Sequence, residues 1–281
     1  MGAGLQLQTL TRAQGSLIRQ LLREKTVRAK EGAFVVEGAT HCLDLISHHP
    51  QAVRSLLVSP SYLRLETETD RAIRSELLTR QFLCSDLVFR QLTDVETPQG
   101  ILTVVQQPQW DEGHVLGRSK VLGIYGDRLR DPANVGAIIR TAAALNLSGV
   151  WLTNDSADHF SPKVVRSTAG TLLNLPIFRT PDFQSVTSSG CEIYSAVLSA
   201  ADKVPIRAIQ TIPKRLMIAV GNEGVGLSSE IMKVSRLRFF IPLAEGVESL
   251  NVAATVAISA FYFGGLAIDS SGDRAQPSQS A

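Results

Sequence analysis

Three segments in the second half of the chain combine glycine with polar side chains that could bind a charged or flat ligand. The first is DRLRDPANVGAIIRTAAALNLSGV (127–150), in which a strand leads through a polar turn to a helix that begins near Pro132. Asn134 and Gly136 fall in the first helical turn, where free backbone N–H groups and the helix dipole favour an anion such as a phosphate group. Arg140 lies six residues after Asn134, on roughly the opposite helical face. A capped helix with a surface arginine explains these positions equally well.

The second segment, AVGNEGVGL (219–227), follows an apolar strand and holds three glycines. Gly221, Gly224 and Gly226 at the end of a buried strand make a backbone surface that a flat cofactor can approach closely. Their spacing is GxxGxG, which differs from the GxGxxG of dinucleotide-binding folds, and the turn comes late in the chain. A nicotinamide-dependent dehydrogenase is therefore disfavoured. Glu223, inside the turn, is suited either to bond a ribose hydroxyl or to order the loop.

The third segment, FFIPLAEGVESLNVAATVAISAF (239–261), runs from a strand that ends at Pro242 through a loop into a long helix that starts near Leu250. Ser249 or Asn251 would serve as the cap of that helix. Because this loop follows a strand end, as the glycine turn does, the two are expected to meet at one crevice of the sheet. Open α/β sheets bind their ligands at that place.

A regular alternation of strands and helices positions these three segments. Apolar strands are expected at 119–126, 150–153, 192–197, 214–220 and 236–242. Helices or helical turns are expected at 133–146, 162–173 and 228–234 and from 250 onward. The strands are apolar without strict alternation, which is typical of a parallel sheet that is covered on both faces. The sequence therefore predicts an α/β domain in the second half of the chain.

The first half of the chain shows a shorter alternation of the same kind. Helices are expected at 17–30 and 39–47, and strands at 34–38, 53–59, 81–84 and 100–105. The segment QQPQWDEGHVLG (106–117) has no periodicity and is the best candidate linker, and the tail from Ser270 is polar. Four regions are therefore expected: a small α/β domain at 1–105, a linker at 106–118, the larger domain at 119–268 and a disordered tail at 269–281.

The composition is that of an ordinary globular protein and excludes few functions. Of the 281 residues, 44% are hydrophobic and 19% are charged, and the net charge of +2 is too weak to indicate nucleic-acid binding by itself. The three cysteines lie far apart and the five histidines show no ligand spacing, so we expect neither a disulfide framework nor a metal site. The first ten residues lack the pattern of a secretory signal, which favours the reducing cytoplasm.

One uncharged stretch, from Leu250 to Ile268, is about as long as a membrane span. Polar residues and a glycine pair interrupt it, and no positive cluster flanks either end. We therefore expect a helix that is buried in the core or in a subunit interface, and no membrane association.

The three segments, taken together and in this order, resemble the SpoU family of the SPOUT RNA methyltransferases. The matching stretches are NVGAIIRTA (134–142), VGNEGVGL (220–227) and IPLAEGVESLNVAATVAI (241–258). Near the N-terminus, FVVEGATHCLDLI (34–46) is similar to the family's substrate-binding domain, which resembles ribosomal protein L30e. The resemblance covers nearly the whole chain. It implies an L30e-like N-terminal domain, a parallel-sheet SPOUT domain with a deep trefoil knot, which general topology rules would not suggest, and a homodimer whose active site lies at or near the subunit interface.

The resemblance also implies a cofactor, S-adenosylmethionine, and the residues around it. The family forms the cofactor pocket from the backbone at a glycine, an isoleucine and a leucine position. The candidate cofactor-binding residues here are Gly221, Asn222, Gly224, Ile241, Leu250 and Asn251. The family's polar active-site positions, which are the candidate catalytic residues, fall on Asn134, Arg140, Glu223, Ser249 and Asn251.

The implied reaction is an in-line attack by a ribose 2′-hydroxyl of structured RNA on the methyl group of S-adenosylmethionine. The protein must then chiefly align the reactants and help to remove the hydroxyl proton. Arg140 is expected to hold the phosphate next to the target ribose and, directly or through that phosphate, to assist deprotonation. An arginine is a poor general base, which favours the phosphate-binding part of this role. The cations expected to contact RNA are Arg19, Arg23, Lys25, Arg28 and Lys30 near the N-terminus, and Lys163 and Arg166 near the active site. A solvated helix face explains the N-terminal group equally well.

Ribosomal RNA is the expected substrate, by analogy with proteins that carry a similar N-terminal module. Two alternatives stay open. One is a transfer RNA 2′-O-methyltransferase, and the other is a non-catalytic RNA-binding or ribosome-assembly factor that has kept the fold. Tight binding of S-adenosylmethionine would count against the second alternative.

Overall fold

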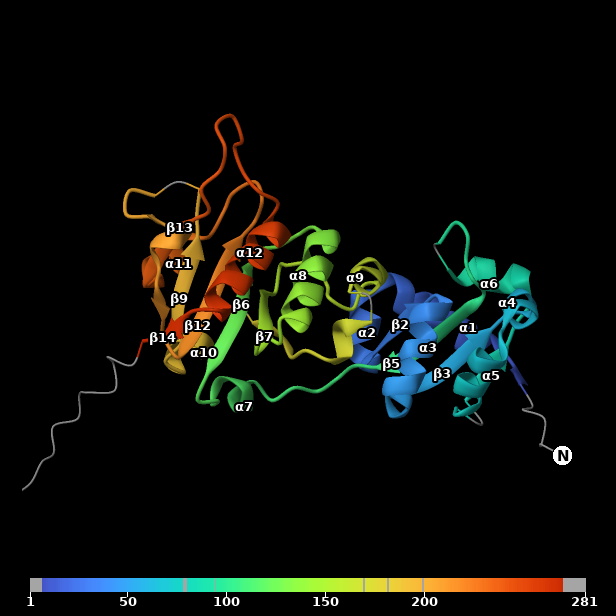
Figure 1. Cartoon of the computed structure of the whole chain (residues 1–281). Coiled ribbons are helices and arrows are strands. Elements are labelled where there is room, and N and C mark those ends of the chain that lie inside the picture. Colours follow the sequence, from blue (N-terminus) through green and yellow to red (C-terminus); the bar gives the residue numbers. More distant parts are fainter. Residues whose placement is uncertain are drawn as a thin grey trace, which may run out of the picture. The chain divides into compact units, whose positions relative to one another are not determined.

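In a computed structural model of the chain, the described residues are 7–77, 80–93, 95–168, 170–180, 182–198 and 200–269. They form two compact units, each described by itself below (Figure 1). Among the described residues, unit 1 draws on 7–109 and 158–173, and unit 2 draws on 110–157 and 174–269. The expected tail at 269–281 lies outside the described residues except for Asp269.

Unit 1 is built on a five-stranded mixed sheet with the order β1-β4-β3-β5-β2. Its strands are β1 (Gln8–Thr9), β2 (Ala33–Glu37), β3 (Val53–Val58), β4 (Gln81–Leu83) and β5 (Ile101–Gln106). Its helices are α1 (Arg12–Arg23), α2 (Lys25–Glu31), α3 (Ala39–His48), α4 (Pro60–Leu65), α5 (Glu68–Ser75), α6 (Asp86–Leu92) and α9 (Pro162–Ser167), with 3-10 turns η1 (Pro50–Ala52) and η2 (Thr171–Leu173). The expected strands of the first half are therefore confirmed.

The single helix expected at 17–30 is two helices. α1 begins earlier, because Thr11 and Gln14 form a reciprocal capping box at its start. Glu24 has an extended backbone between α1 and α2, and it breaks the helix there. The break allows α2 to turn Arg28 inward, where its side chain is only 4% exposed.

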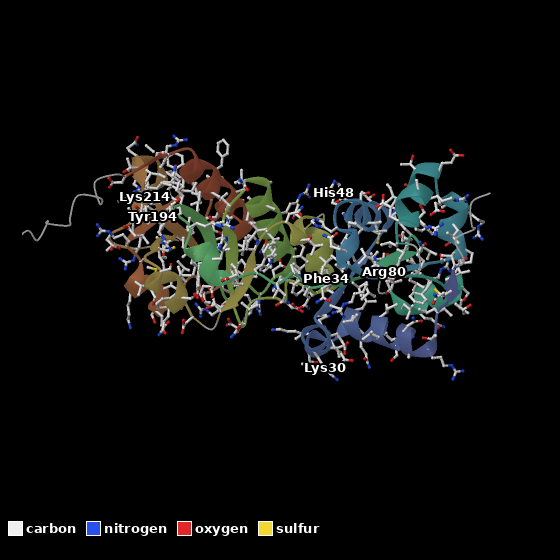
Figure 2. All side chains as sticks on the ribbon, turned by 90° about the horizontal axis from the view of Figure 1, so that it is seen from below. Lys30, Phe34, His48, Arg80, Tyr194 and Lys214 are labelled. Atoms are coloured by element: carbon white, nitrogen blue, oxygen red, sulfur yellow. The ribbon has the colours of Figure 1, made fainter. Side chains whose placement is uncertain are left out.

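The segment 158–173 belongs to unit 1, although it lies between two strands of unit 2 in the sequence. Arg28 explains part of this placement, because its Nε and Nη2 donate to Asp158 Oδ2 at 2.8 and 2.7 Å. Its Nη1 donates to the carbonyl of Leu21 at 2.7 Å. Phe34, buried inside unit 1 and marked in Figure 2, stacks on Phe160 with ring centroids 4.9 Å apart. The buried guanidinium of Arg28 needs the Asp158 carboxylate as a partner, because an unpaired charge away from water is very costly.

Unit 2 is built on a seven-stranded sheet in which every pair of neighbours is parallel, as the sequence predicts. The strand order is β10-β13-β9-β12-β6-β7-β8. These strands are β6 (Val121–Asp127), β7 (Gly149–Thr153), β8 (Ile177–Thr180), β9 (Glu192–Ala196), β10 (Val204–Pro205), β12 (Arg215–Gly221) and β13 (Leu237–Phe240). A separate pair joins β11 (Thr211–Ile212) to β14 (Ala267–Ile268). The helical segments are α7 (Glu112–Leu116), α8 (Pro132–Ala144), α10 (Gln184–Ser188), α11 (Ser229–Val234), α12 (Val252–Gly264) and the 3-10 turn η3 (Ile206–Ala208).

Helices cover both faces of this sheet. On one face, apolar side chains of α7, α10 and α11 join the core around Tyr125, Trp151 and Met217. On the other face, α12 packs beside α8 and contacts β6 and β12. Phe263 of α12 meets Phe239 edge-on with ring centroids 5.1 Å apart. The uncharged C-terminal stretch is thus a partly buried helix of 13 residues, and none of the helices in the described part of the chain has the length and apolar character for crossing a membrane.

Several short elements of unit 2 are absent from the sequence prediction. β8 is one of them, because its four residues, IFRT, alternate too briefly to stand out. The expected linker contains α7, whose Val115 and Leu116 are buried in the core. Glu112 of the same helix accepts a hydrogen bond from Trp151 Nε1 at 2.8 Å. Packing against distant residues therefore orders a segment that has no periodicity of its own.

Candidate cofactor and substrate site

The carboxyl ends of β9, β12 and β13 meet at one edge of the parallel sheet, and loops follow from each of them. Figure 1 shows the loops after β12 and β13 above the sheet. Together with the first turn of α12, these loops enclose a cavity of about 690 Å³. The structure thus brings the glycine turn and the loop before α12 to one crevice, as the strand ends predict.

All six candidate cofactor-binding residues line this cavity. They are Gly221, Asn222, Gly224, Ile241, Leu250 and Asn251. The sequence prediction missed the wall at the end of β9, which consists of Ala196, the last residue of the strand, and of Val197 and Leu198 after it. The signal was present, because the strand expected at 192–197 ends at the same edge of the sheet as the other two.

The glycine turn, which we define as residues 221–227, is closed by its own backbone. The N–H of Gly226 donates to the carbonyl of Asn222 at 2.8 Å, and Asn222 Oδ1 accepts from the N–H groups of Gly224 and Val225 at 2.9 and 3.2 Å. A Cβ on Gly221 would lie 2.3 Å from the carbonyl carbon of Gly226, and Gly226 has a φ of +69°. A Cβ is therefore excluded at Gly221 by the close approach, and the positive φ favours glycine at Gly226. The Asn222 side chain therefore shapes the turn as well as lining the cavity.

Three candidate catalytic residues form one hydrogen-bonded cluster. Asn134 Nδ2 donates to Glu223 Oε1, and Asn134 Oδ1 accepts from Asn251 Nδ2 at 2.8 Å. Asn251 also caps α12, because its Oδ1 accepts from the N–H of Ala253 at 2.8 Å. The cluster therefore ties α8, the glycine turn and the start of α12 together beside the cavity.

This cluster corrects the expectation that Asn134 and Gly136 present an anion site. Asn134 is only 7% exposed, and its amide is used by Glu223 and Asn251. Gly136 is buried as well. The first turn of α8 instead packs against neighbouring elements, and Asp131 caps it by accepting from the N–H of Ala133 at 2.9 Å.

The two remaining candidate catalytic residues lie apart from the cluster. Ser249 is exposed and lines the cavity. Arg140 is exposed on α8 and is not among the residues that line the cavity. The structure therefore does not bring Arg140 to the cavity of its own chain. Within the described ranges, no group of three or more His, Cys, Asp or Glu side chains is placed to hold a metal ion.

The candidate RNA-binding cations divide into exposed residues and one buried residue. The exposed ones are Arg19, Arg23, Lys25, Lys30, Lys163 and Arg166. Lys30 on α2 is marked in Figure 2, and Lys163 and Arg166 lie on α9, within unit 1. Arg28 does not belong to this surface, because its guanidinium is buried against Asp158 and the carbonyl of Leu21. Its charge balances the partly buried carboxylate of Asp158 instead of a phosphate.

Comparisons with known proteins agree on one family. The model of the SpoU rRNA Methylase family matches residues 122–261, and the model of the MRM3-like substrate binding domain matches residues 17–103. The 23S rRNA (guanosine(2553)-2′-O)-methyltransferase RlmP of Bacillus subtilis (strain 168) is 31% identical over 247 residues, which are 87% of this chain and 93% of that protein.

Solved structures resemble the chain over most of its length. One is the SpoU methyltransferase AviRb from Streptomyces viridochromogenes in complex with the cofactor AdoMet, with a TM-score of 0.79, 26% identity and coverage of 90% of this chain and 97% of that one. Another is the AdoMet-bound rRNA methyltransferase from Sinorhizobium meliloti, with a TM-score of 0.75, 27% identity and coverage of 91% and 95%. The motifs, the cavity and these similarities agree, and the chain belongs to the SpoU rRNA methylase family.

Proposed function

We propose that this protein transfers a methyl group from S-adenosylmethionine to a ribose 2′-hydroxyl of ribosomal RNA. The observation that carries the proposal is the cavity of about 690 Å³ at the carboxyl edge of the sheet, with the Asn134–Glu223–Asn251 cluster beside it. The name of RlmP, a 23S rRNA 2′-O-methyltransferase, supports the substrate class. The structure of AviRb, which was solved with AdoMet, supports the cofactor.

The residues of the cavity fit S-adenosylmethionine. The closed glycine turn leaves a backbone surface that a Cβ at Gly221 would disrupt, which suits close contact with a flat ring. Ile241 and Leu250 add apolar walls, and Glu223 supplies a carboxylate for a hydroxyl group. When bound, the cofactor supplies an electrophilic methyl group on a sulfonium. The chain's own residues then orient the ribose oxygen and keep the reactants aligned.

Among the polar residues, Asn134, Glu223 and Asn251 hold the turn and the helix start in register, and Ser249 faces the entering substrate from the rim. Arg140 holds the phosphate next to the target ribose. Since Arg140 lies outside the cavity of its own chain, we assign it to the partner subunit's cavity in a homodimer.

Apolar surface supports the homodimer. α12, which packs beside α8, exposes Ile258 and Phe261 to 41% and 76%. Exposed apolar residues that occur together on one helix are typical of subunit interfaces. The proposal includes the deep trefoil knot. After β13 the chain passes through a loop into α12, and α12 contacts β6 and β12 in the middle of the sheet, which is in keeping with a knot.

We also propose that the protein works in the reducing cytoplasm. The three cysteines, Cys42, Cys84 and Cys191, are free and buried. Burial raises the pKa of the Cys42 thiol to about 12, so this thiol stays protonated at neutral pH. Such thiols need no oxidising compartment.

The proposed function is tested by incubating the purified chain with labelled S-adenosylmethionine and either ribosomal RNA or transfer RNA, and by mapping 2′-O-methyl sites in the product. We expect cofactor binding and label in one or a few nucleotides of ribosomal RNA. Label in transfer RNA alone would replace ribosomal RNA by transfer RNA as the assigned substrate. Absence of cofactor binding would favour the alternative of a non-catalytic RNA-binding factor.

Three exposed cations of α1 and α2 are expected to contribute to RNA affinity. Replacing Arg19, Lys25 and Lys30 by glutamine should weaken RNA binding and lower the slope of log affinity against log salt by about one for each phosphate contact that is lost. The measurement is a filter-binding or anisotropy titration at several salt concentrations. Arg71→Gln on α5, also exposed, is the matched control and should keep the wild-type slope. A triple variant with an unchanged slope would show that these side chains are only a solvated helix face.

A further inference from the structure

Arg128 follows β6 directly, at the edge of the sheet where the cavity opens, and its backbone has a left-handed φ of +56°. Residues other than glycine, asparagine and aspartate rarely adopt this conformation, and residues held in it cluster at functional sites. Contacts on both sides keep it there. The Arg128 N–H donates to Thr153 Oγ1 at 2.8 Å, and its carbonyl accepts from Asn222 Nδ2 at 3.1 Å.

The side chain of Arg128 reaches the glycine turn as well. Its Nη2 donates to the carbonyl of Gly226 at 3.2 Å. The Asp127 carboxylate accepts from Arg128 Nε and Nη2 at 3.3 and 3.4 Å, and its Oδ2 also accepts from the N–H of Ser228 at 2.6 Å. Asp127 is 3% exposed, so its charge is held among these donors with little water. The pair therefore bonds the glycine turn at Asn222 near its start and at Gly226 near its end, and it also bonds Ser228, the residue that follows the turn.

We propose that Arg128, held by Asp127, is a positioning residue that fixes the glycine turn in the form that binds S-adenosylmethionine. The inference rests on the function proposed above. The bonds inside the turn close it on itself, and the pairing of Gly221 with Asp127 in the β12–β6 ladder holds only its first residue. The Arg128 side chain attaches the far part of the turn, at Gly226, to the end of β6 with a charge-assisted hydrogen bond, a class of bond that is stronger than neutral ones. Arg128 acts on the cofactor through the turn.

The Arg128 side chain is 31% exposed and lies at the edge of the sheet rather than in the core. Its loss should therefore loosen the turn locally and leave the global stability of unit 2 nearly unchanged. A purely structural arginine in the core would instead lower the unfolding temperature. A substitution can separate the two roles, because loss of a positioning residue changes cofactor affinity, whereas loss of a core arginine changes the unfolding temperature.

The test is Arg128→Asn, because asparagine adopts a positive φ readily and the variant deletes the guanidinium without new backbone strain. We expect the Kd for S-adenosylmethionine, measured by calorimetry, to rise about tenfold or more, because a hydrogen bond to a charged group is lost. The KM for the cofactor should rise with it, while kcat at saturating cofactor and the KM for RNA stay near wild type. Arg130→Asn, an exposed arginine two residues further on, is the matched control and should bind the cofactor normally.

Arg128→Lys keeps the charge but has a single donor nitrogen, so it should give an intermediate Kd. An unchanged cofactor Kd in Arg128→Asn, or a lower kcat without a change in that Kd, would overturn the inference. If Arg128→Asn does not unfold cooperatively, Asp127→Asn takes its place, because it keeps an acceptor for the Ser228 N–H and removes the charge that holds Arg128. That variant must weaken cofactor binding in the same direction, and wild-type affinity would overturn the inference. Failure of the wild-type chain to bind S-adenosylmethionine would instead contradict the proposed function.

Discussion

Arg140→Ala is expected to lower methyl transfer by about 100-fold or more, the scale seen when a charge-stabilising group is removed from an active site. The side chain is exposed on α8, so the free energy of unfolding should change by no more than about 0.5 kcal/mol. The Kd for S-adenosylmethionine should also stay at the wild-type value, because Arg140 is assigned to the RNA phosphate and does not line the cavity of its own chain. Initial rates on ribosomal RNA measure methyl transfer, and calorimetry measures the Kd for the cofactor. Arg236→Ala, an exposed arginine at the amino end of β13, is the matched control and should stay active.

A mixing experiment decides which subunit's cavity Arg140 serves. Arg140→Ala subunits keep an intact cavity, and Gly221→Ala subunits keep Arg140 but should lose the cavity. If Arg140 acts across the interface, co-expressed subunits should recover about a quarter of wild-type activity, since half of the dimers are mixed and each mixed dimer holds one complete site. If Arg140 acts within its own chain, no mixed dimer holds a complete site. Activity no higher than that of the two single variants would therefore contradict the assignment to the partner subunit.

Most of the fold and of the cavity could be predicted from local sequence signals. The parallel sheet follows from apolar strands without alternation, and the cavity follows from loops that leave the carboxyl ends of such strands. Gly221 and Gly226 signal a backbone constraint, and the structure shows that constraint as a close approach and a positive φ. These features depend on neighbours in sequence or on rules that hold for every parallel sheet.

The parts that could not be predicted depend on partners far along the chain. Arg28 has the surroundings of a surface cation in sequence, but its partner Asp158 lies 130 residues away. Asn134 sits at a helix start that suits an anion, yet its amide bonds Glu223 and Asn251, which are 89 and 117 residues away. A single sequence holds no signal for such pairs, because local propensity and hydrophobic period describe only the element that carries each residue.

Gly221→Ala is expected to remove most cofactor binding, because of backbone sterics alone. The added Cβ would lie 2.3 Å from the carbonyl carbon and 2.4 Å from the oxygen of Gly226, so the side chain cannot be accommodated by rotation of a neighbouring group. The turn must open, which breaks the bond from the Gly226 N–H to Asn222 and moves the surface that binds the cofactor. Overpacking of about 1–3 kcal/mol corresponds to an affinity loss of about tenfold to 100-fold.

Gly264→Ala at the end of α12 separates this effect from a general intolerance of alanine. A Cβ there would lie 3.9 Å from Leu122 Cδ2, an ordinary contact, so cofactor affinity should stay at the wild-type value. Calorimetric titration with S-adenosylmethionine and thermal unfolding without it are the two measurements. Both variants should unfold cooperatively, since Gly221 ends β12 and Gly264 ends α12, and neither residue is buried. A Gly221→Ala variant that binds the cofactor like the wild type would show that the closed turn is not the surface on which S-adenosylmethionine rests.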